Sequence, residues 1–247
     1  MGFVKASLAF RPVIGLFLSR GCPVCDRPTA QTFCLDCQRQ IFQPKTAQNQ
    51  PKDRPDPSGN PALPISALGQ YEGALKRAIL AMKYSDRPEV ALPLGTALGW
   101  HWLAQQKKSQ NAVNPIDRTA VYAVPIPLHD SRQKSRGFNQ AELIARAFCR
   151  VSKLPLLAHG LVRAESTRPQ HELGLTERQQ NLAQVFQIGA SLHQRANRAR
   201  SQGKARPTVL LVDDIYTTGA TVQSAAATLS QNGIAVVGVA TVARAYL

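Results

Sequence analysis

The chain has 247 residues, which is enough for one well-packed domain and a small appendage. Its 30 lysines and arginines outnumber 15 acidic residues, which gives a formal net charge of +15 at pH 7. This charge excludes no fold, because net charge determines partners and solubility rather than architecture. It is compatible with nucleic acid, a polyphosphate ligand or an anionic membrane surface, and equally with basic loops that are simply solvated.

The N-terminal segment contains an apolar stretch, residues 13–18, that is too short to span a bilayer. No small-residue cleavage site follows this stretch, so a secretory signal peptide is not indicated. Nothing later in the chain approaches a membrane span. We therefore expect a soluble, cytoplasmic protein.

Two Cys-x2-Cys pairs follow, and they consist of Cys22, Cys25, Cys34 and Cys37. Such pairs can bind one metal ion in the tetrahedral thiolate site typical of Zn²⁺, and four protein ligands leave no position for a catalytic water. Disulfides would need an oxidising compartment, and redox Cys-x2-Cys motifs usually accompany a βαβ pattern. An iron–sulfur cluster is the remaining alternative. We predict a structural zinc module over residues 1–42, whose folding depends on the metal.

Residues 43–64 are rich in proline and polar residues, so we expect a linker without a core. The main domain then covers residues 65–247. Its first expected helix spans residues 71–84, with an apolar face of Leu75, Ile79 and Met82. Lys83 lies off this face. A second helix is expected over residues 90–104, after Pro88 and with a kink at Pro93.

A strand is expected over residues 120–127 and is followed by a basic segment that we predict to be an anion-binding loop. The segment contains Arg132, Lys134, Arg136 and Gly137. Asn139 and Glu142 then indicate a capping box at the start of a helix. Cys149 lies in this helix, where we expect it to be buried or half-buried and without function.

Two polar segments lie between this helix and the last third of the chain. Residues 161–188 have few apolar anchors, which is typical both of a mobile lid and of an ordinary surface excursion. Residues 190–206 contain five basic residues and no acid, and we expect a disordered basic insertion there.

The most informative stretch is residues 209–221. Its four aliphatic residues predict a strand buried on both faces of a parallel sheet, with Asp213 and Asp214 at the carboxyl end, where such sheets bind ligands. A Thr/Gly loop then opens a helix that ends at Gly233. Loop N–H groups and the helix dipole favour a phosphate, and the carboxylates can accept hydrogen bonds from vicinal hydroxyls.

This arrangement predicts a single pocket for a sugar phosphate. The prediction would fail if the two aspartates were buried in salt links or faced away from any crevice. The alternative is an ordinary strand that happens to end in two aspartates.

The stretch resembles the signature of type I phosphoribosyltransferases, which bind phosphoribosyl pyrophosphate (PRPP). The resemblance implies that Asp213 and Asp214 bind the ribose hydroxyls. It also implies that the 5′-phosphate is bound by Thr217, Thr218, Gly219, Ala220 and Thr221, and that Mg²⁺ accompanies PRPP if the protein is a catalyst. The basic segment at Arg132–Gly137 would then bind the pyrophosphate.

The whole chain resembles the competence protein F family. The matching blocks are the cysteine pairs, Tyr71–Tyr84, Val124–Ala141, Thr167–Gln170, Arg178 with Asn181, and residues 212–221. The resemblance implies an α/β fold of the type I phosphoribosyltransferase kind, with a mostly parallel sheet flanked by helices and a small zinc module. It further implies a part in taking up single-stranded DNA in transformable bacteria, with an uptake helicase and strand-loading proteins as partners. Other members are linked to nutrient use.

Two hypotheses about activity stay open, and neither assigns a catalytic residue. In a phosphoribosyltransferase, Thr217 would stand where the oxopurine enzymes have a carboxylate, so ammonia or an amine is a better acceptor than an oxopurine. Alternatively, the protein is a non-catalytic sensor or binds DNA phosphates through its basic run. Aromatic residues are only 6% of the chain, which argues against a stacking groove but permits phosphate contacts.

Overall fold

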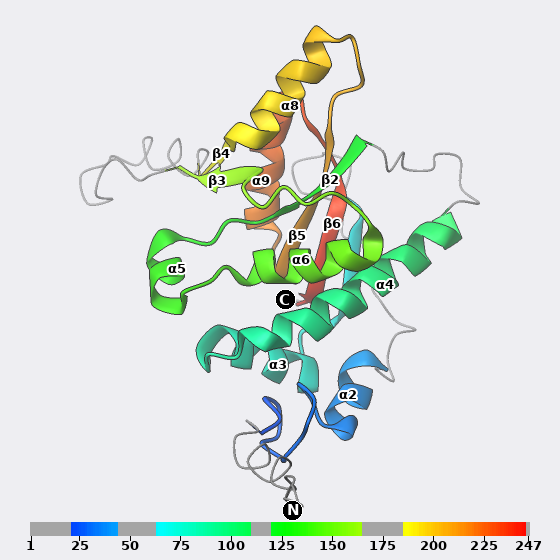
Figure 1. Ribbon diagram of the computed structural model, residues 1–247, viewed down its shortest axis with the longest axis vertical. Helices are drawn as coiled ribbons and strands as arrows, with labels where there is room; N and C mark the ends of the chain where they lie inside the picture. Colours follow the sequence, from blue (N-terminus) through cyan, green and yellow to red (C-terminus); the bar gives the residue numbers. More distant parts are fainter. Residues whose placement is uncertain (1–20, 44–62, 110–119, 165–184, 246–247) are drawn as a thin grey trace, which may run out of the picture.

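The computed structural model describes residues 21–43, 63–109, 120–164 and 185–245 (Figure 1). The N-terminal apolar stretch, most of the expected linker and most of the lid-like segment lie outside these residues. That segment includes Thr167–Gln170, Arg178 and Asn181, so the structure does not place these residues.

The centre of the described chain is a four-stranded sheet in the order β1-β6-β5-β2. All three strand pairs are parallel, which confirms the expected α/β class. The strands are β1 (Ile65–Gln70), β2 (Val121–Pro125), β5 (Thr208–Tyr216) and β6 (Ala235–Arg244). Strand β1 was not predicted, because its sequence ISALGQ has neither a continuous apolar run nor a clear alternation.

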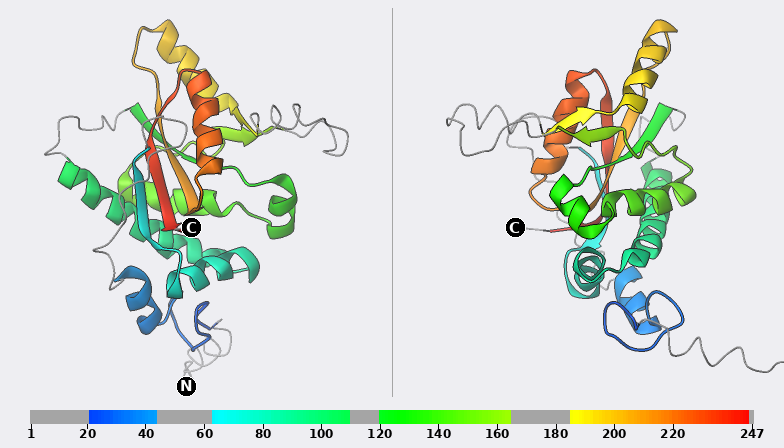
Figure 2. Two further views of the ribbon diagram at one scale, coloured as in Figure 1. Left: turned by 180° about the vertical axis from the view of Figure 1, so that it is seen from behind. Right: turned by 60° about the vertical axis from the view of Figure 1, so that its left-hand side comes forward.

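Helices cover both faces of the sheet, and the alternation of side chains along β5 explains why (Figure 2). Leu210 and Val212 belong to an apolar cluster with helices α3 (Gly73–Tyr84), α4 (Ala91–Ser109) and α6 (Gln140–Ser152). Val209 and Leu211 belong to a second cluster, with α9 (Ala220–Gln231) on the opposite face. A strand buried on both sides requires the continuous apolar run seen in the sequence.

Three helices of the main domain match their predictions closely. In α3, Leu75, Ile79 and Met82 are buried as expected. Helix α4 follows a short 3₁₀ turn, η1 (Pro88–Val90), and continues through Pro93. Pro93 stands in the first turn, where a backbone N–H has no intrahelical partner, so the proline causes no break.

The start of α6 confirms only half of the predicted capping box. Asn139 is the N-cap, and its side chain accepts a hydrogen bond from the backbone N–H of Ala141. Glu142 does not complete the box. Its carboxylate instead accepts hydrogen bonds from Arg146, one turn along the helix.

The basic segment before α6 is a helix, so the prediction of a loop was wrong. Helix α5 (Asp130–Arg136) has His129 as its N-cap, whose Nδ1 accepts a hydrogen bond from the N–H of Ser131. It ends at Gly137, which has the positive φ angle of 76° that glycine adopts most readily. Its arginine, lysine and glutamine residues are good helix formers. The prediction considered only their charge, which suggested a loop.

The second basic segment is also helical, which corrects the expectation of a disordered insertion. Helix α8 (Ala190–Ser201) follows a small antiparallel pair, β3 (Leu161–Arg163) and β4 (Phe186–Ile188). Buried Leu192 anchors α8 to the second apolar cluster. Figure 1 shows α8 at one end of the molecule and α2 (Leu35–Phe42), which carries Cys37, at the other.

Candidate ligand cleft and metal centre

A cleft of about 500 Å³ lies at the carboxyl end of β5, where the sequence placed the ligand site. Asp213 and Asp214 both line it, so neither faces away from a crevice. The cleft also takes residues from α3, from the segment between β2 and α6, and from β3. Its polar lining includes Lys83, His129, Ser131, Arg132, Arg136, Asn139, Gln140, Arg163, Asp213, Asp214, Thr217 and Thr221.

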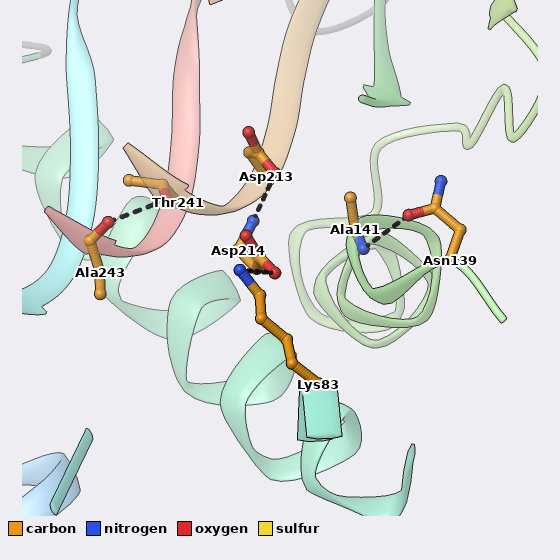
Figure 3. Close-up of polar contacts among 7 residues, drawn as sticks. All are labelled: Lys83, Asn139, Ala141, Asp213, Asp214, Thr241 and Ala243. Carbon is orange, nitrogen blue, oxygen red and sulfur yellow. Dashed lines mark hydrogen bonds and ion pairs between the residues drawn. The ribbon is translucent and has the colours of Figure 1, made fainter. Parts of the chain in front are cut away.

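Asp214 forms an ion pair, which was not anticipated from the sequence. The ammonium Nζ of Lys83 lies 2.8 Å from Asp214 Oδ2, and the two side chains are only 16% and 12% exposed (Figure 3). A carboxylate this deeply placed needs a compensating charge, and the last turn of α3 supplies it. A ligand hydroxyl that binds Asp214 must therefore either share its carboxylate with Lys83 or displace the lysine ammonium.

Asp213 occupies a different environment, although it is the adjacent residue. Its Oδ1 accepts a hydrogen bond of 2.8 Å from the backbone N–H of Asp214 (Figure 3). Burial raises the pKa of the Asp213 carboxyl to about 8, and the negative charge of Asp214 adds to the rise. The backbone hydrogen bond and the charge of Lys83 act in the opposite direction. The acidic pair thus combines one charge-compensated carboxylate with one that holds a proton more tightly.

The Thr/Gly loop connects β5 to the N-terminus of α9. Thr217 and Thr221 line the cleft, whereas Thr218, Gly219 and Ala220 lie in the same turn without lining it. Gly219 has φ 82°, and a Cβ atom there would collide with the hydroxyl group of Tyr216. Only glycine fits this position without strain. The turn directs the first N–H groups of α9, which have no intrahelical partners, toward this edge of the sheet.

Positive side chains also line the cleft. Of the four residues predicted in the basic segment, Arg132 and Arg136 line the cleft, while Lys134 and Gly137 do not. Sequence reasoning missed Arg163, whose guanidinium Nε donates to the carbonyl oxygen of Pro127 at 3.4 Å. It also missed Lys83, for which the one available signal was a lysine off the apolar face in the last turn of a helix.

The four cysteines come together as predicted. One sulfur atom from each of Cys22, Cys25, Cys34 and Cys37 lies within 4.8 Å of the other three. Tetrahedral zinc–thiolate sites have Zn–S distances of about 2.3 Å, which brings the sulfurs into this range. Burial raises the pKa of the Cys22 thiol, but hydrogen bonds from the backbone at Cys34, Val24 and Cys25 outweigh burial and lower it to about 7. Such hydrogen bonds favour the thiolate that a metal ligand requires. The cluster can therefore hold a structural metal ion.

No family model matches the chain. DNA utilization protein YhgH of Escherichia coli strain K12 is 29% identical over 220 residues, which cover 88% of this chain and 87% of that protein. Competence protein F of Haemophilus influenzae is 33% identical over 122 residues, or 49% of each chain. Competence protein ComFC of Bacillus subtilis is 36% identical over 110 residues, which cover 44% of this chain and 38% of that protein. The chain is therefore homologous to proteins named for competence and for DNA utilization.

The cysteine cluster is attached to the main domain through α3. Cys22, Phe33, Cys37 and Ile41 belong to the same apolar cluster as Leu75, Ala78 and Ile79 of that helix. Just after α3, Arg87 Nη2 donates to the carbonyl oxygen of Gly21 at 2.8 Å. These contacts fix the position of the metal centre relative to the sheet.

The described part of the chain contains no helix that combines the length and apolarity needed to cross a bilayer.

Proposed function

We propose that the chain binds a phosphoribosyl ligand of the PRPP class in the cleft at the end of β5 and acts in competence or DNA utilization. One observation carries the ligand proposal. The acidic pair and the Thr/Gly turn of α9 line the same cleft as three arginines and a lysine. The relatives named as competence and DNA utilization proteins support the process.

The two sides of the cleft suit the two ends of such a ligand. Thr217, Thr221 and the N-terminus of α9 would bind the 5′-phosphate, while Asp213 and Asp214 would accept hydrogen bonds from the ribose hydroxyls. Arg132, Arg136 and Arg163 would bind the pyrophosphate, because guanidinium groups match phosphate oxygens in pairs. Thr218, Gly219 and Ala220 were also predicted to bind the phosphate, and we propose that they do so through the backbone of the turn.

If turnover occurs, a nucleophile attacks the anomeric carbon of PRPP as the bond from that carbon to the pyrophosphate oxygen breaks. The bonding electrons leave with the pyrophosphate, and the arginines stabilise the growing negative charge. Thr217 cannot remove a proton from the acceptor. An uncharged amine, which needs no prior deprotonation to attack, is therefore the acceptor class that we favour.

We expect D213A/D214A to weaken PRPP binding by at least about 100-fold, since one charge-assisted acceptor, Asp214, and a second side-chain partner of the ribose hydroxyls, Asp213, are lost together. Isothermal calorimetry with PRPP measures the effect, and circular dichroism verifies folding. D36A is the control, because Asp36 is an exposed carboxylate of α2, away from the cleft. Equal PRPP affinity in D213A/D214A and in the wild type would rule out the proposed site. Release of pyrophosphate with an amine acceptor separates an enzyme from a non-catalytic sensor.

A second function, contact with DNA phosphates, is favoured by the structure of α8. Arg195, Arg198 and Arg200 are exposed on this helix, and Lys204 and Arg206 are exposed just after it. The helix has no acidic residue. Such a surface fits single-stranded DNA through its phosphates, without base stacking. An uptake helicase and strand-loading proteins remain the proposed partners on the same DNA.

We expect R198E/R200E to weaken binding to single-stranded DNA and to reduce the slope of log affinity against log salt by about 0.7 for each lost phosphate contact. Fluorescence anisotropy with a labelled oligonucleotide at several salt concentrations measures both quantities. K107E/K108E reverses two exposed charges at the end of α4 and serves as the matched control. The same loss in both double variants would mean that net charge, and not α8, determines binding.

A further inference from the structure

The ammonium group of Lys83 compensates the negative charge of Asp214 in the cleft. Its side chain extends from the last turn of α3 to Asp214, and it also lines an adjoining cavity of about 660 Å³. Both partners of the ion pair are largely covered. The ammonium is therefore a fixed part of the ligand site, and its contact with Asp214 is shielded from solvent screening.

The lining of the cleft has more positive than negative groups. Among the described residues, the two carboxylates face Lys83, Arg132, Arg136 and Arg163. A polyphosphate entering the cleft would meet this positive charge directly. Enzymes of the phosphoribosyltransferase type are expected to bind PRPP together with Mg²⁺, which supplies such charge.

The donor set at the aspartates does not suit Mg²⁺. This ion requires oxygen ligands in near-octahedral geometry at about 2.0–2.1 Å. Asp214 Oδ2 already accepts the Lys83 ammonium at 2.8 Å, and Asp213 Oδ1 accepts the backbone N–H of Asp214. A divalent cation at the other oxygens of Asp213 and Asp214 would stand beside the Lys83 ammonium, whose like charge repels it.

We propose that Lys83 is the built-in counter-cation of the cleft and that PRPP binds to this protein without Mg²⁺. The inference rests on the proposed PRPP site. Lysine suits this role because its ammonium is a compact point charge with three donors. It can hold Asp214 with one N–H and offer another to a ribose hydroxyl or a phosphate oxygen.

The inference predicts that PRPP binding will come to depend on Mg²⁺ when the ammonium of Lys83 is removed. In K83M, Asp213 and Asp214 lack their nearest positive partner in a poorly hydrated site, which favours a divalent cation. Calorimetry should be carried out with PRPP in EDTA and in Mg²⁺, and with Mg²⁺ alone. Wild type should bind PRPP with affinities that differ by about twofold or less between the two conditions.

K83M should lose at least about tenfold in PRPP affinity in EDTA, recover most of it in Mg²⁺, and bind Mg²⁺ alone more tightly than the wild type does. K83R, which keeps the charge, should stay independent of Mg²⁺ and keeps the test usable if K83M does not fold. K76M is the matched control, because Lys76 is an exposed lysine of α3 that lines neither cavity.

The possible failures can be told apart. Wild-type binding of PRPP only in Mg²⁺ would overturn the inference and leave the proposed function intact. Binding in neither condition would overturn the proposed function, and the role of Lys83 would fall with it. A K83M variant that binds PRPP in EDTA as tightly as K76M would overturn the inference alone.

Discussion

C37S is expected to abolish metal binding by the chain and to lower its stability by several kcal/mol. Cys37 is buried, and its sulfur is one of four that can surround a single ion. Apparent binding free energies of structural zinc are about 10–16 kcal/mol in small modules, and folding of such modules depends on this energy. Metal analysis by mass spectrometry and thermal unfolding measure the two effects. We expect one zinc ion per wild-type chain and none in the variant.

The chain offers a matched control in its fifth cysteine. Cys149 lies half-buried in α6 and does not belong to the four-cysteine cluster, so it is not expected to bind the metal ion. C149S should keep the full metal content. If the metal analysis instead finds iron together with inorganic sulfide in the purified wild type, the four cysteines bind an iron–sulfur cluster and not zinc. A metal-free but equally stable C37S protein would show that the cluster is not structural.

D213N is expected to stabilise the protein at alkaline pH. The raised pKa of Asp213, about 8 against 3.8 ordinarily, means that the folded chain holds a proton that the unfolded chain releases. The contribution of Asp213 to the free energy of unfolding therefore falls as pH rises from about 4 to about 8. Above this window the charged carboxylate destabilises the folded state, and we expect D213N to be more stable by about 2–4 kcal/mol.

Chemical denaturation of wild type and D213N from pH 4 to pH 9 measures this difference. The two proteins should be nearly equal at pH 4 and should diverge steadily toward pH 8. Asparagine keeps the side-chain oxygen that accepts the N–H of Asp214, so geometry is preserved. D36N, at an exposed carboxylate, should show no such divergence. A constant difference between wild type and D213N at all pH values would contradict a raised pKa.

Local sequence patterns predicted the parts of the fold that depend on local physics. The apolar run before Asp213, the helical face of Leu75, Ile79 and Met82, and the spacing of the cysteines each determine a structure without reference to distant residues. The helices α5 and α8 were missed because their charge suggested solvated chain, although arginine, glutamine and alanine are good helix formers.

The composition of the cleft was harder to predict. Asp213, Asp214, Thr217 and Thr221 belong to one continuous motif, so their proximity follows from the strand–turn–helix unit. Lys83 and Arg163 reach the same cleft from α3 and β3, far away in sequence. Their positions depend on how the layers pack, and no short-range pattern encodes that. The ion pair of Asp214 was missed for the same reason.

The placement of α3 has a consequence for how the protein responds to its surroundings. The helix packs against the cysteine-bearing segment, Arg87 just beyond it binds Gly21, and its last turn delivers Lys83 to Asp214. Helix α3 thus connects the cysteine cluster to the cleft at the end of β5. We therefore expect loss of a bound metal ion, or oxidation of the cysteines, to shift α3 and with it Lys83. Ligand binding in the cleft would then weaken, although the two sites share no side chain.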